Sequence, residues 1–153
     1  MDLILWRHAD AVDLREGGDD LERALTPKGE RQAKRMAQWL ARQLPSGARV
    51  LVSPAVRAQQ TAAAMERRSR TVPELAPDGT VDALLAATRW PDAREPVLVI
   101  GHQPALGMAA SYLLTGQATP MPLRKGGIIW LRRRQREGEF RVLLQAALSP
   151  DLV

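Results

Sequence analysis

The chain has 153 residues, of which 45% are hydrophobic and 25% are charged, so disordered and fibrous classes are excluded and we expect one globular domain over residues 1–153. It contains no cysteine, which excludes disulfides, thiol catalysis and cysteine-based metal sites. The net charge of +5 indicates an anionic partner, and because no signal peptide or membrane span is visible, we expect a cytoplasmic protein without membrane contact.

Short apolar runs alternate with amphipathic segments along the chain, which is the pattern of an α/β layer fold. The first strand is expected at about residues 2–7, and a polar loop follows it from Asp10 to Asp20. Thr26 and Pro27 are typical of a helix start. Apolar residues then recur at helical spacing, at Ala33, Met36, Ala37, Leu40 and Leu44. One face of this helix should therefore pack on the sheet.

The middle of the chain continues this alternation of strands and helices. In order, we expect a strand at 49–52, a helix from Ser53-Pro54 to about Arg67, an ordered loop at 72–79, a helix at about 80–89, a strand at 97–101 and a helix at about 104–114. The segment 72–79 is expected to be a loop because neither a strand pattern nor a helix pattern fits its prolines.

The last third of the sequence predicts a β-hairpin with strands at about 127–131 and 140–144 and a turn around 137–139. Residues 124–141 carry the whole net positive charge of the chain. We interpret these charges as a device that keeps an edge hairpin from pairing with other sheets. Nucleic-acid binding is the alternative, and it is disfavoured because the chain has only one Tyr and one Phe to stack on bases.

The only two histidines each follow an apolar run, His8 after the first predicted strand and His102 after the third. If these strands are parallel neighbours, their carboxyl ends bring both imidazoles to the crevice where open α/β sheets bind ligands. Arg7 directly precedes His8, and Arg57 lies on the first turn of the helix after the second strand. We therefore expect Arg7, His8, Arg57 and His102 to converge, with the loop at 72–79 nearby.

Each of these residues also has an ordinary explanation. A lone histidine at a strand end is more often structural, and a lone Arg57 would be a surface charge; only the combination of the four predicts a site. A zinc or iron centre is the alternative for paired histidines. Neither histidine has a further ligand at metal-binding spacing except Asp10, so we predict no metal and no cofactor.

Five short motifs carry a family resemblance. They are Arg7-His8-Ala9, Leu25-Thr26-Pro27-Lys28-Gly29, Ser53-Pro54 with Arg57, Gln60-Thr61-Ala62, and Gly101-His102. Together they resemble the histidine phosphatase superfamily, and most closely its small phosphohistidine phosphatases of the SixA type, over nearly the whole chain. The superfamily's Arg-His-Gly (RHG) motif has glycine where this chain has Ala9, which should change the pocket wall slightly and leave activity intact. The resemblance implies a phosphoglycerate mutase-like α/β/α sandwich of three layers, with a mostly parallel central sheet and an antiparallel C-terminal edge hairpin.

The resemblance also implies a mechanism without metal. A neutral nitrogen of His8 attacks phosphorus, and water then hydrolyses the resulting phosphohistidine. Arg7 and Arg57 bind the phosphoryl oxygens and lower the pKa of the imidazole, while His102 donates to one of these oxygens as negative charge builds on it. The general acid is less defined, with Asp20, Asp10, Glu74 and Asp78 as candidates; Asp20 is preferred because SixA-type enzymes carry an aspartate in the same loop.

The favoured substrate is phosphohistidine on a protein partner, with inorganic phosphate as product. An imidazole leaving group needs much less protonation than an alkoxide, so a poorly placed acid is consistent with an N–P bond. A short chain also leaves little room for cap insertions that enclose small substrates. Two alternatives stay open: a phosphatase of the same fold acting on small phosphorylated metabolites, and a non-catalytic module that binds phosphate or nucleic acid through residues 124–141.

Overall fold

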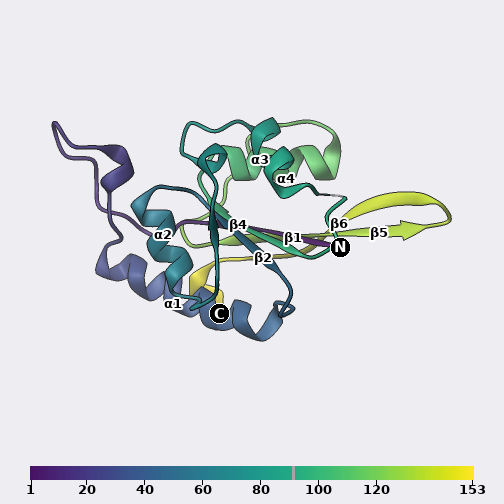
Figure 1. Ribbon diagram of the computed structural model, residues 1–153, viewed down its shortest axis with the longest axis horizontal. Coiled ribbons are helices and arrows are strands. Elements are labelled where there is room, and N and C mark those ends of the chain that lie inside the picture. The colour runs from purple at the N-terminus through teal and green to yellow at the C-terminus, as the bar shows by residue number, and fades with distance from the viewer. Residues whose placement is uncertain (91) are drawn as a thin grey trace.

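The computed structural model describes residues 1–90 and 92–153, which form a six-stranded sheet between two layers of helices (Figure 1). The strands are β1 (Asp2–Arg7), β2 (Arg49–Val52), β3 (Arg70–Thr71), β4 (Val97–Gly101), β5 (Ile128–Arg136) and β6 (Glu139–Leu148). Their order is β3-β2-β4-β1-β5-β6, in which the first four strands are parallel and the last two antiparallel. The predicted mostly parallel sheet with a C-terminal edge hairpin is confirmed.

Two helices cover each face of the sheet (Figure 1). They are α1 (Pro27–Gln43) and α2 (Val56–Ala63) on one face, and α3 (Val81–Thr88) and α4 (Ala105–Thr115) on the other. Short 3-10 turns occur at Asp20–Glu22, Pro73–Leu75 and Pro150–Leu152. In residues 1–90 and 92–153, no helix combines the length and the apolar character that crossing a bilayer requires.

The alternation of side chains along β1 explains why this strand is apolar throughout. Ile4 and Trp6 pack in one core with residues of α1 and α2, whereas Leu3 and Leu5 pack in a second core with residues of α3 and α4. All four side chains are fully buried. A strand covered on both faces has no polar side to alternate with its apolar one, so the continuous apolar run is the expected pattern of a central parallel strand.

The helix predicted after Ser53-Pro54 is shorter than expected. It begins at Val56 and ends at Ala63, not at Arg67. The last turn tightens, because Glu66 donates its N–H to the carbonyl of Ala63 only three residues back and adopts a left-handed conformation with φ of 52°. The chain then reverses so that β3 can pair with β2. Pairing with the sheet therefore overrides a helical pattern that the sequence alone would continue.

The segment predicted as an ordered loop at 72–79 contains one turn of helix. Pro73–Leu75 forms a 3-10 turn, with proline at a position that needs no backbone N–H donor. Leu75 is buried in the core beneath α3 and α4. The prolines that disfavour a long element are therefore compatible with a single helical turn, which anchors the rest of the segment above the sheet.

The register between β1 and β4 brings the two histidines to the same edge. The strands are parallel, with Arg7 opposite Gly101, and the N–H of His8 donates to the carbonyl of Gly101 at 3.1 Å. On the other side of β4, the N–H of Ser53 donates to the carbonyl of Ile100 at 3.0 Å. His8, Ser53 and His102 consequently leave three neighbouring strands at the same end of the sheet.

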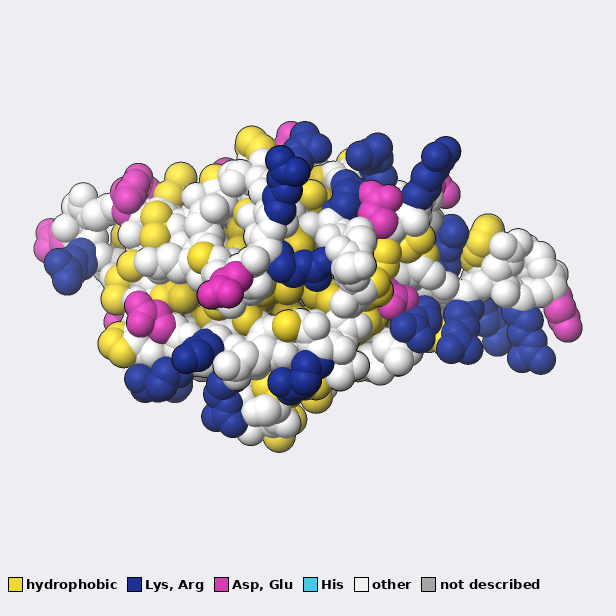
Figure 2. All heavy atoms as spheres, turned by 60° about the horizontal axis from the view of Figure 1, so that its bottom comes forward, with side chains coloured by type: hydrophobic (Ala, Val, Ile, Leu, Met, Phe, Trp, Pro, Cys, Tyr) yellow, Lys and Arg dark blue, Asp and Glu magenta, His cyan; other side chains and the backbone are white. Residues whose placement is uncertain are grey.

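The C-terminal hairpin points away from that end. β5 runs antiparallel to β1, with Ile128 opposite Trp6 and Arg132 opposite Asp2, so the hairpin starts beside the histidines and its tip lies at the opposite end. Arg132 there makes two hydrogen bonds to Asp2, of 2.8 and 2.9 Å. Arginine side chains line the hairpin where it projects from the molecule at the right of Figure 2. The structure thus divides the basic 124–141 segment between two ends of the sheet.

Candidate active site

The four residues expected to converge line one pocket of about 170 Å³ at the carboxyl ends of the parallel strands. They are Arg7, His8, Arg57 and His102, and we call this cavity the histidine pocket. Its remaining walls are formed by Ala11, Asp13, Arg23, Pro77, Gln103 and Lys125. Pro77 belongs to the loop that the sequence predicts near the site, and that position is confirmed.

His8 is buried and holds its ring in a defined tautomer. Its Nδ1 lies 2.8 Å from the carbonyl oxygen of Ala9. Because a carbonyl oxygen only accepts, Nδ1 carries the proton and Nε2 of the neutral ring has a free lone pair. Burial lowers the pKa of His8; the hydrogen bond to Ala9 opposes this and the charges of Arg57 and Arg7 add to it, which leaves the pKa at about 4. At neutral pH, Nε2 is therefore ready to act as a nucleophile.

Thr61 fixes the backbone just after His8. Its hydroxyl accepts from the N–H of Ala9 at 3.1 Å and donates to the carbonyl of Arg57 at 2.7 Å, which joins the exit of β1 to α2. The side chain of Ala9 packs in a small core with Leu25 and Ala33 and is not among the residues that line the histidine pocket. The expectation that Ala9 changes the pocket wall is therefore wrong, because its methyl group faces this core.

His102 is also neutral, and Ser53 determines where its proton lies. The hydroxyl of Ser53 accepts from the N–H of Ala55 at 3.2 Å and lies 2.7 Å from Nε2 of His102. Among the described residues Nε2 is the only acceptor for the proton of the hydroxyl, so the hydroxyl donates to Nε2 and the proton of the ring is on Nδ1. Burial, followed by the charges of His8 and Arg57, lowers the pKa of His102 to about 3. The two imidazole centroids are 5.1 Å apart.

The two arginines are held by backbone carbonyls. Arg57, only 3% exposed, donates from Nη1 to the carbonyl of Asp20 at 2.7 Å, and Arg7 donates from Nη1 to the carbonyl of Leu123 at 2.8 Å. In both guanidinium groups Nε is buried and has no hydrogen-bond partner among the described residues. Nδ1 of His102 is likewise buried and has no hydrogen-bond partner among the described residues. The pocket is lined by four cationic side chains, Arg7, Arg23, Arg57 and Lys125, against one carboxylate, Asp13, so its charge suits an anion.

Asp20 lies beside the pocket and does not line it. Its carboxylate accepts from Arg57 at 3.1 Å and from Arg23 at 2.9 Å, and its side chain is 42% exposed. Desolvation raises the pKa of Asp20, but the hydrogen bonds from Arg57 and Arg23 outweigh it, and the net pKa is lowered. An ionised carboxylate has no proton to donate. In the free protein this geometry favours a positioning role for Asp20 over the acid role that the sequence predicts.

The other candidate acids lie outside the pocket walls as well. Asp10 is paired with Lys125 at 3.1 Å, and neither Glu74 nor Asp78 borders the histidine pocket. The carboxylate that does line it, in the described part of the chain, is Asp13, which the sequence did not single out. Residues 1–90 and 92–153 contain no group of three or more His, Asp or Glu side chains arranged to hold a metal ion.

The lowered pKa values predict how the two histidines titrate. A solvated histidine changes charge near a pKa of about 6.5. Since the pKa values of His8 and His102 are about 4 and about 3, both rings should stay neutral as the pH falls from about 8 to about 5.5. The Cε1–H signals of the pair in proton NMR should then be constant over this range, with the variant His8→Asn assigning them. A signal that moves with a midpoint near 6.5 would contradict the buried, neutral pair.

Comparisons with known proteins agree with this geometry. The family model of the histidine phosphatase superfamily (branch 1) matches residues 3–78. The chain is 33% identical to the phosphohistidine phosphatase SixA of Escherichia coli K12 over 129 residues, 79% of each chain. It is 38% identical to an uncharacterised protein of Picosynechococcus over 142 residues, 86% of this chain and 85% of the relative.

Solved structures show the same relationship. The protein histidine phosphatase SixA complexed with tungstate is 31% identical, with a TM-score of 0.78 over 99% of both chains. A putative SixA from Nakamurella multipartita is 28% identical, with a TM-score of 0.80 over 97% of this chain and 95% of that one. A phosphoserine phosphatase of Entamoeba histolytica is 16% identical over 97% of both chains and shares the fold, with a TM-score of 0.72.

Proposed function

This chain belongs to the histidine phosphatase superfamily and is a SixA-like phosphatase, and from this we propose that it hydrolyses phosphohistidine on a protein partner through a covalent intermediate on His8. One observation carries the proposal. The pocket that His8 lines carries four cationic side chains, those of Arg7, Arg23, Arg57 and Lys125, against one carboxylate, that of Asp13. This excess of positive charge suits an oxyanion, and the related SixA structure is a complex with the oxyanion tungstate.

Turnover proceeds in two displacements. The Nε2 lone pair of His8 attacks phosphorus, a bond forms between Nε2 and phosphorus, and the N–P bond of the substrate breaks; the departing imidazole keeps the electron pair and takes a proton from solvent water. A water oxygen then attacks phosphorus and releases a proton to the solvent, the electron pair of the broken P–N bond returns to Nε2 of His8, and inorganic phosphate leaves. The low pKa of His8, about 4, keeps its lone pair available throughout the neutral range.

The cationic and neutral donors have different parts in this scheme. Arg7 and Arg57 hold the phosphoryl oxygens with permanent charge, and their guanidinium forks fix the group in line with Nε2 of His8. His102 donates from Nδ1 to an oxygen of the same group, and Ser53 keeps the proton on that nitrogen. This donor costs nothing to reorganise, because it is already oriented in the free protein.

The size of the pocket and the leaving group favour a phosphorylated protein. Sites that enclose whole small molecules typically measure roughly 300–1,000 Å³. The histidine pocket, at about 170 Å³, suits a phosphoryl group and its linkage, with the rest of the substrate outside. Asp20 is ionised and bound to Arg57, so it gives little help to an alkoxide, whereas an imidazole leaving group needs little.

The proposal is tested by comparing kcat/KM for a phosphohistidine protein with kcat/KM for a panel of phosphate esters. We expect the phosphohistidine protein to be hydrolysed at least about tenfold more efficiently than any alkyl phosphate, because an alkoxide leaves poorly without a proton and the ionised Asp20 supplies none. Faster hydrolysis of a small ester would make the chain a metabolite phosphatase. If the chain hydrolyses neither the phosphohistidine protein nor the esters but still binds phosphate, it is a non-catalytic phosphate-binding module.

The variant Asp20→Asn separates acid catalysis from positioning. If Asp20 positions Arg57, its loss should lower kcat/KM for p-nitrophenyl phosphate and for an alkyl phosphate by the same factor, about tenfold. Asp13→Asn is the matched control, because Asp13 lines the pocket without the ion pair to Arg57. A loss confined to the alkyl phosphate would restore the acid role to whichever aspartate produced it, since only that leaving group depends on a proton.

A further inference from the structure

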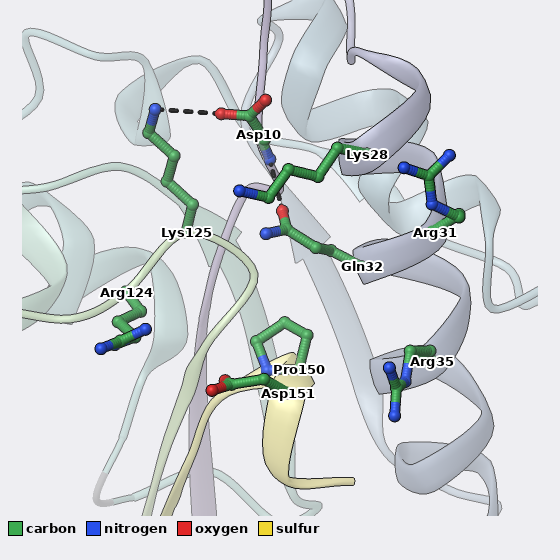
Figure 3. A pocket seen from close by; sticks show the side chains of 9 residues that line it. All are labelled: Asp10, Lys28, Arg31, Gln32, Arg35, Arg124, Lys125, Pro150 and Asp151. Carbon is green, nitrogen blue, oxygen red and sulfur yellow. Dashed lines mark hydrogen bonds and ion pairs between the residues drawn. The ribbon is translucent and has the colours of Figure 1, made fainter.

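A second and larger cavity lies next to the histidine pocket, between α1 and the loop that precedes β5 (Figure 3). It measures about 500 Å³ and is lined by Asp10, Lys28, Arg31, Gln32, Arg35, Arg124, Lys125, Pro150 and Asp151. We call it the basic groove. Figure 3 shows the side chains of α1 on one side of it and those of Arg124 and Lys125 on the other. The mechanism derived above uses none of its walls.

The groove has more positive charge than its own carboxylates neutralise. Five of its lining residues are cationic and two are anionic. Asp10 is already committed, because it pairs with Lys125 at 3.1 Å and accepts from the hydroxyl of Thr26 at 2.7 Å. Within residues 1–90 and 92–153, Lys28, Arg31 and Arg124 make no ion pair. All three are exposed, so their charges are available to a ligand.

The positive charges form a row, which indicates the shape of that ligand. Lys28, Arg31 and Arg35 are spaced as i, i+3 and i+7 on α1 and therefore share one face of the helix. The row extends roughly 10 Å along the helix axis, at ~1.5 Å per residue. An extended peptide covers that length with about three residues, at ~3.3 Å each. One further phosphate group on a small substrate is too short to meet the whole row.

The groove is joined to the histidine pocket through shared residues and backbone bonds. Lys125 lines both cavities. The N–H of Gly126 donates to the carbonyl of His8 at 3.0 Å, and the carbonyl of Leu123 accepts from Arg7. This position requires glycine, since the φ of Gly126 is 74° and a Cβ there would lie 2.8 Å from the ring of Pro150. A chain that places its phosphohistidine on His8 consequently passes close to the basic groove.

We propose that the basic groove docks an acidic segment of the phosphorylated protein, adjacent in space to its phosphohistidine; this inference rests on the proposed function. The charge of the walls, the length of the row and the shared residue Lys125 all point to this occupant. The other basic cluster does not compete for the role. The hairpin arginines Arg133, Arg134 and Arg136 follow Arg132, which pairs with Asp2 at the end of the sheet remote from His8.

Two synthetic phosphohistidine peptides test the proposal. One carries glutamates on both sides of the phosphohistidine and the other carries glutamines. The wild-type protein should hydrolyse the glutamate peptide with a kcat/KM about tenfold higher at low salt, through a lower KM, and the advantage should shrink as salt is added. The double variant Lys28→Glu/Arg31→Glu should lose this advantage and keep the wild-type kcat/KM for the glutamine peptide and for p-nitrophenyl phosphate.

The matched control is Lys34→Glu/Arg134→Glu, which makes the same change of charge at two exposed positions outside the groove. It should retain the preference for the glutamate peptide. Equal loss in both double variants would overturn the proposal, because net charge rather than the groove would then explain it. Equal hydrolysis of the two peptides by the wild type would overturn it too. Hydrolysis of neither peptide would refute the proposed function itself, which keeps the two failures distinct.

The same variants distinguish a small anionic ligand. If the groove instead holds a second phosphate of a metabolite, the wild type should prefer a bisphosphate over the corresponding monophosphate and should treat the two peptides alike. Lys28→Glu/Arg31→Glu would then lose the preference for the bisphosphate. That outcome would replace the acidic peptide as occupant and would overturn the docking proposal.

Discussion

Replacing His8 by alanine should abolish turnover of every phosphorylated substrate, lowering kcat by at least about 10⁴-fold. The reason is covalent: the unprotonated Nε2 of His8 is the atom that receives the phosphoryl group, whereas Nε2 of His102 is already engaged by Ser53. Wild-type protein quenched with radiolabelled substrate should yield an adduct that is labile in acid and stable in base. Peptide mapping should place it on His8.

His102→Ala serves as the control for this experiment. It removes a donor to the phosphoryl oxygen and leaves the nucleophile in place, so labelled adduct should still form, at a reduced rate. Thermal unfolding of both variants should show that each is folded. An adduct on His102, or full activity of His8→Ala without any adduct, would contradict the mechanism.

The second large effect is expected for the two arginines. Arg57→Ala and Arg7→Ala should each lower kcat/KM by about 10²- to 10³-fold, because each removes a preorganised charged donor from the histidine pocket. Arg57 is 3% exposed and lines this pocket, so its truncation removes one of the two charges proposed to hold the phosphoryl group. Lysine at position 57 should restore little, since an ammonium does not reproduce the planar fork.

Arg68→Ala is the matched control for Arg57→Ala. Arg68 is exposed shortly beyond the end of α2 and is not part of the histidine pocket, so its loss should leave kcat/KM unchanged. If Arg57→Ala stays within a few-fold of the wild type while folded, Arg57 serves the structure and not the transition state. For Arg7→Ala, the free energy of unfolding should be measured beside kcat/KM. Arg7 also donates to the carbonyl of Leu123, so its loss removes a structural hydrogen bond as well.

The two histidines of the site could be predicted because each of them follows the same local sequence pattern. A continuous apolar run that ends at a polar residue predicts a buried parallel strand and its carboxyl end. The register of β1 beside β4 then places His8 next to His102, and the same rule applied to β2 would have pointed to Ser53. From the sequence, Ser53 is expected at a helix start and in a family motif, and no contact with His102 is predicted because that contact depends on β2 lying directly beside β4.

The remaining parts of the site depend on loops, whose positions no local pattern specifies. Asp13 and Lys125 reach the histidine pocket from two segments that pass over the same edge of the sheet. The ionised state of Asp20 likewise follows from its contacts with Arg57 and Arg23 and not from its place in the loop. The early end of α2 at Ala63 has a similar origin, since strand pairing farther along the chain decides it.

The loop of residues 123–126 connects the two cavities. It is bound to Arg7 through Leu123 and to His8 through Gly126, while its Arg124 and Lys125 line the basic groove. By reciprocity, the factor by which a phosphoryl group in the pocket tightens a segment in the groove equals the factor by which the segment tightens the phosphoryl group. If the proposed partner occupies both cavities, departure of phosphate would weaken its hold in the groove by the same factor, and release of the two products would be coupled.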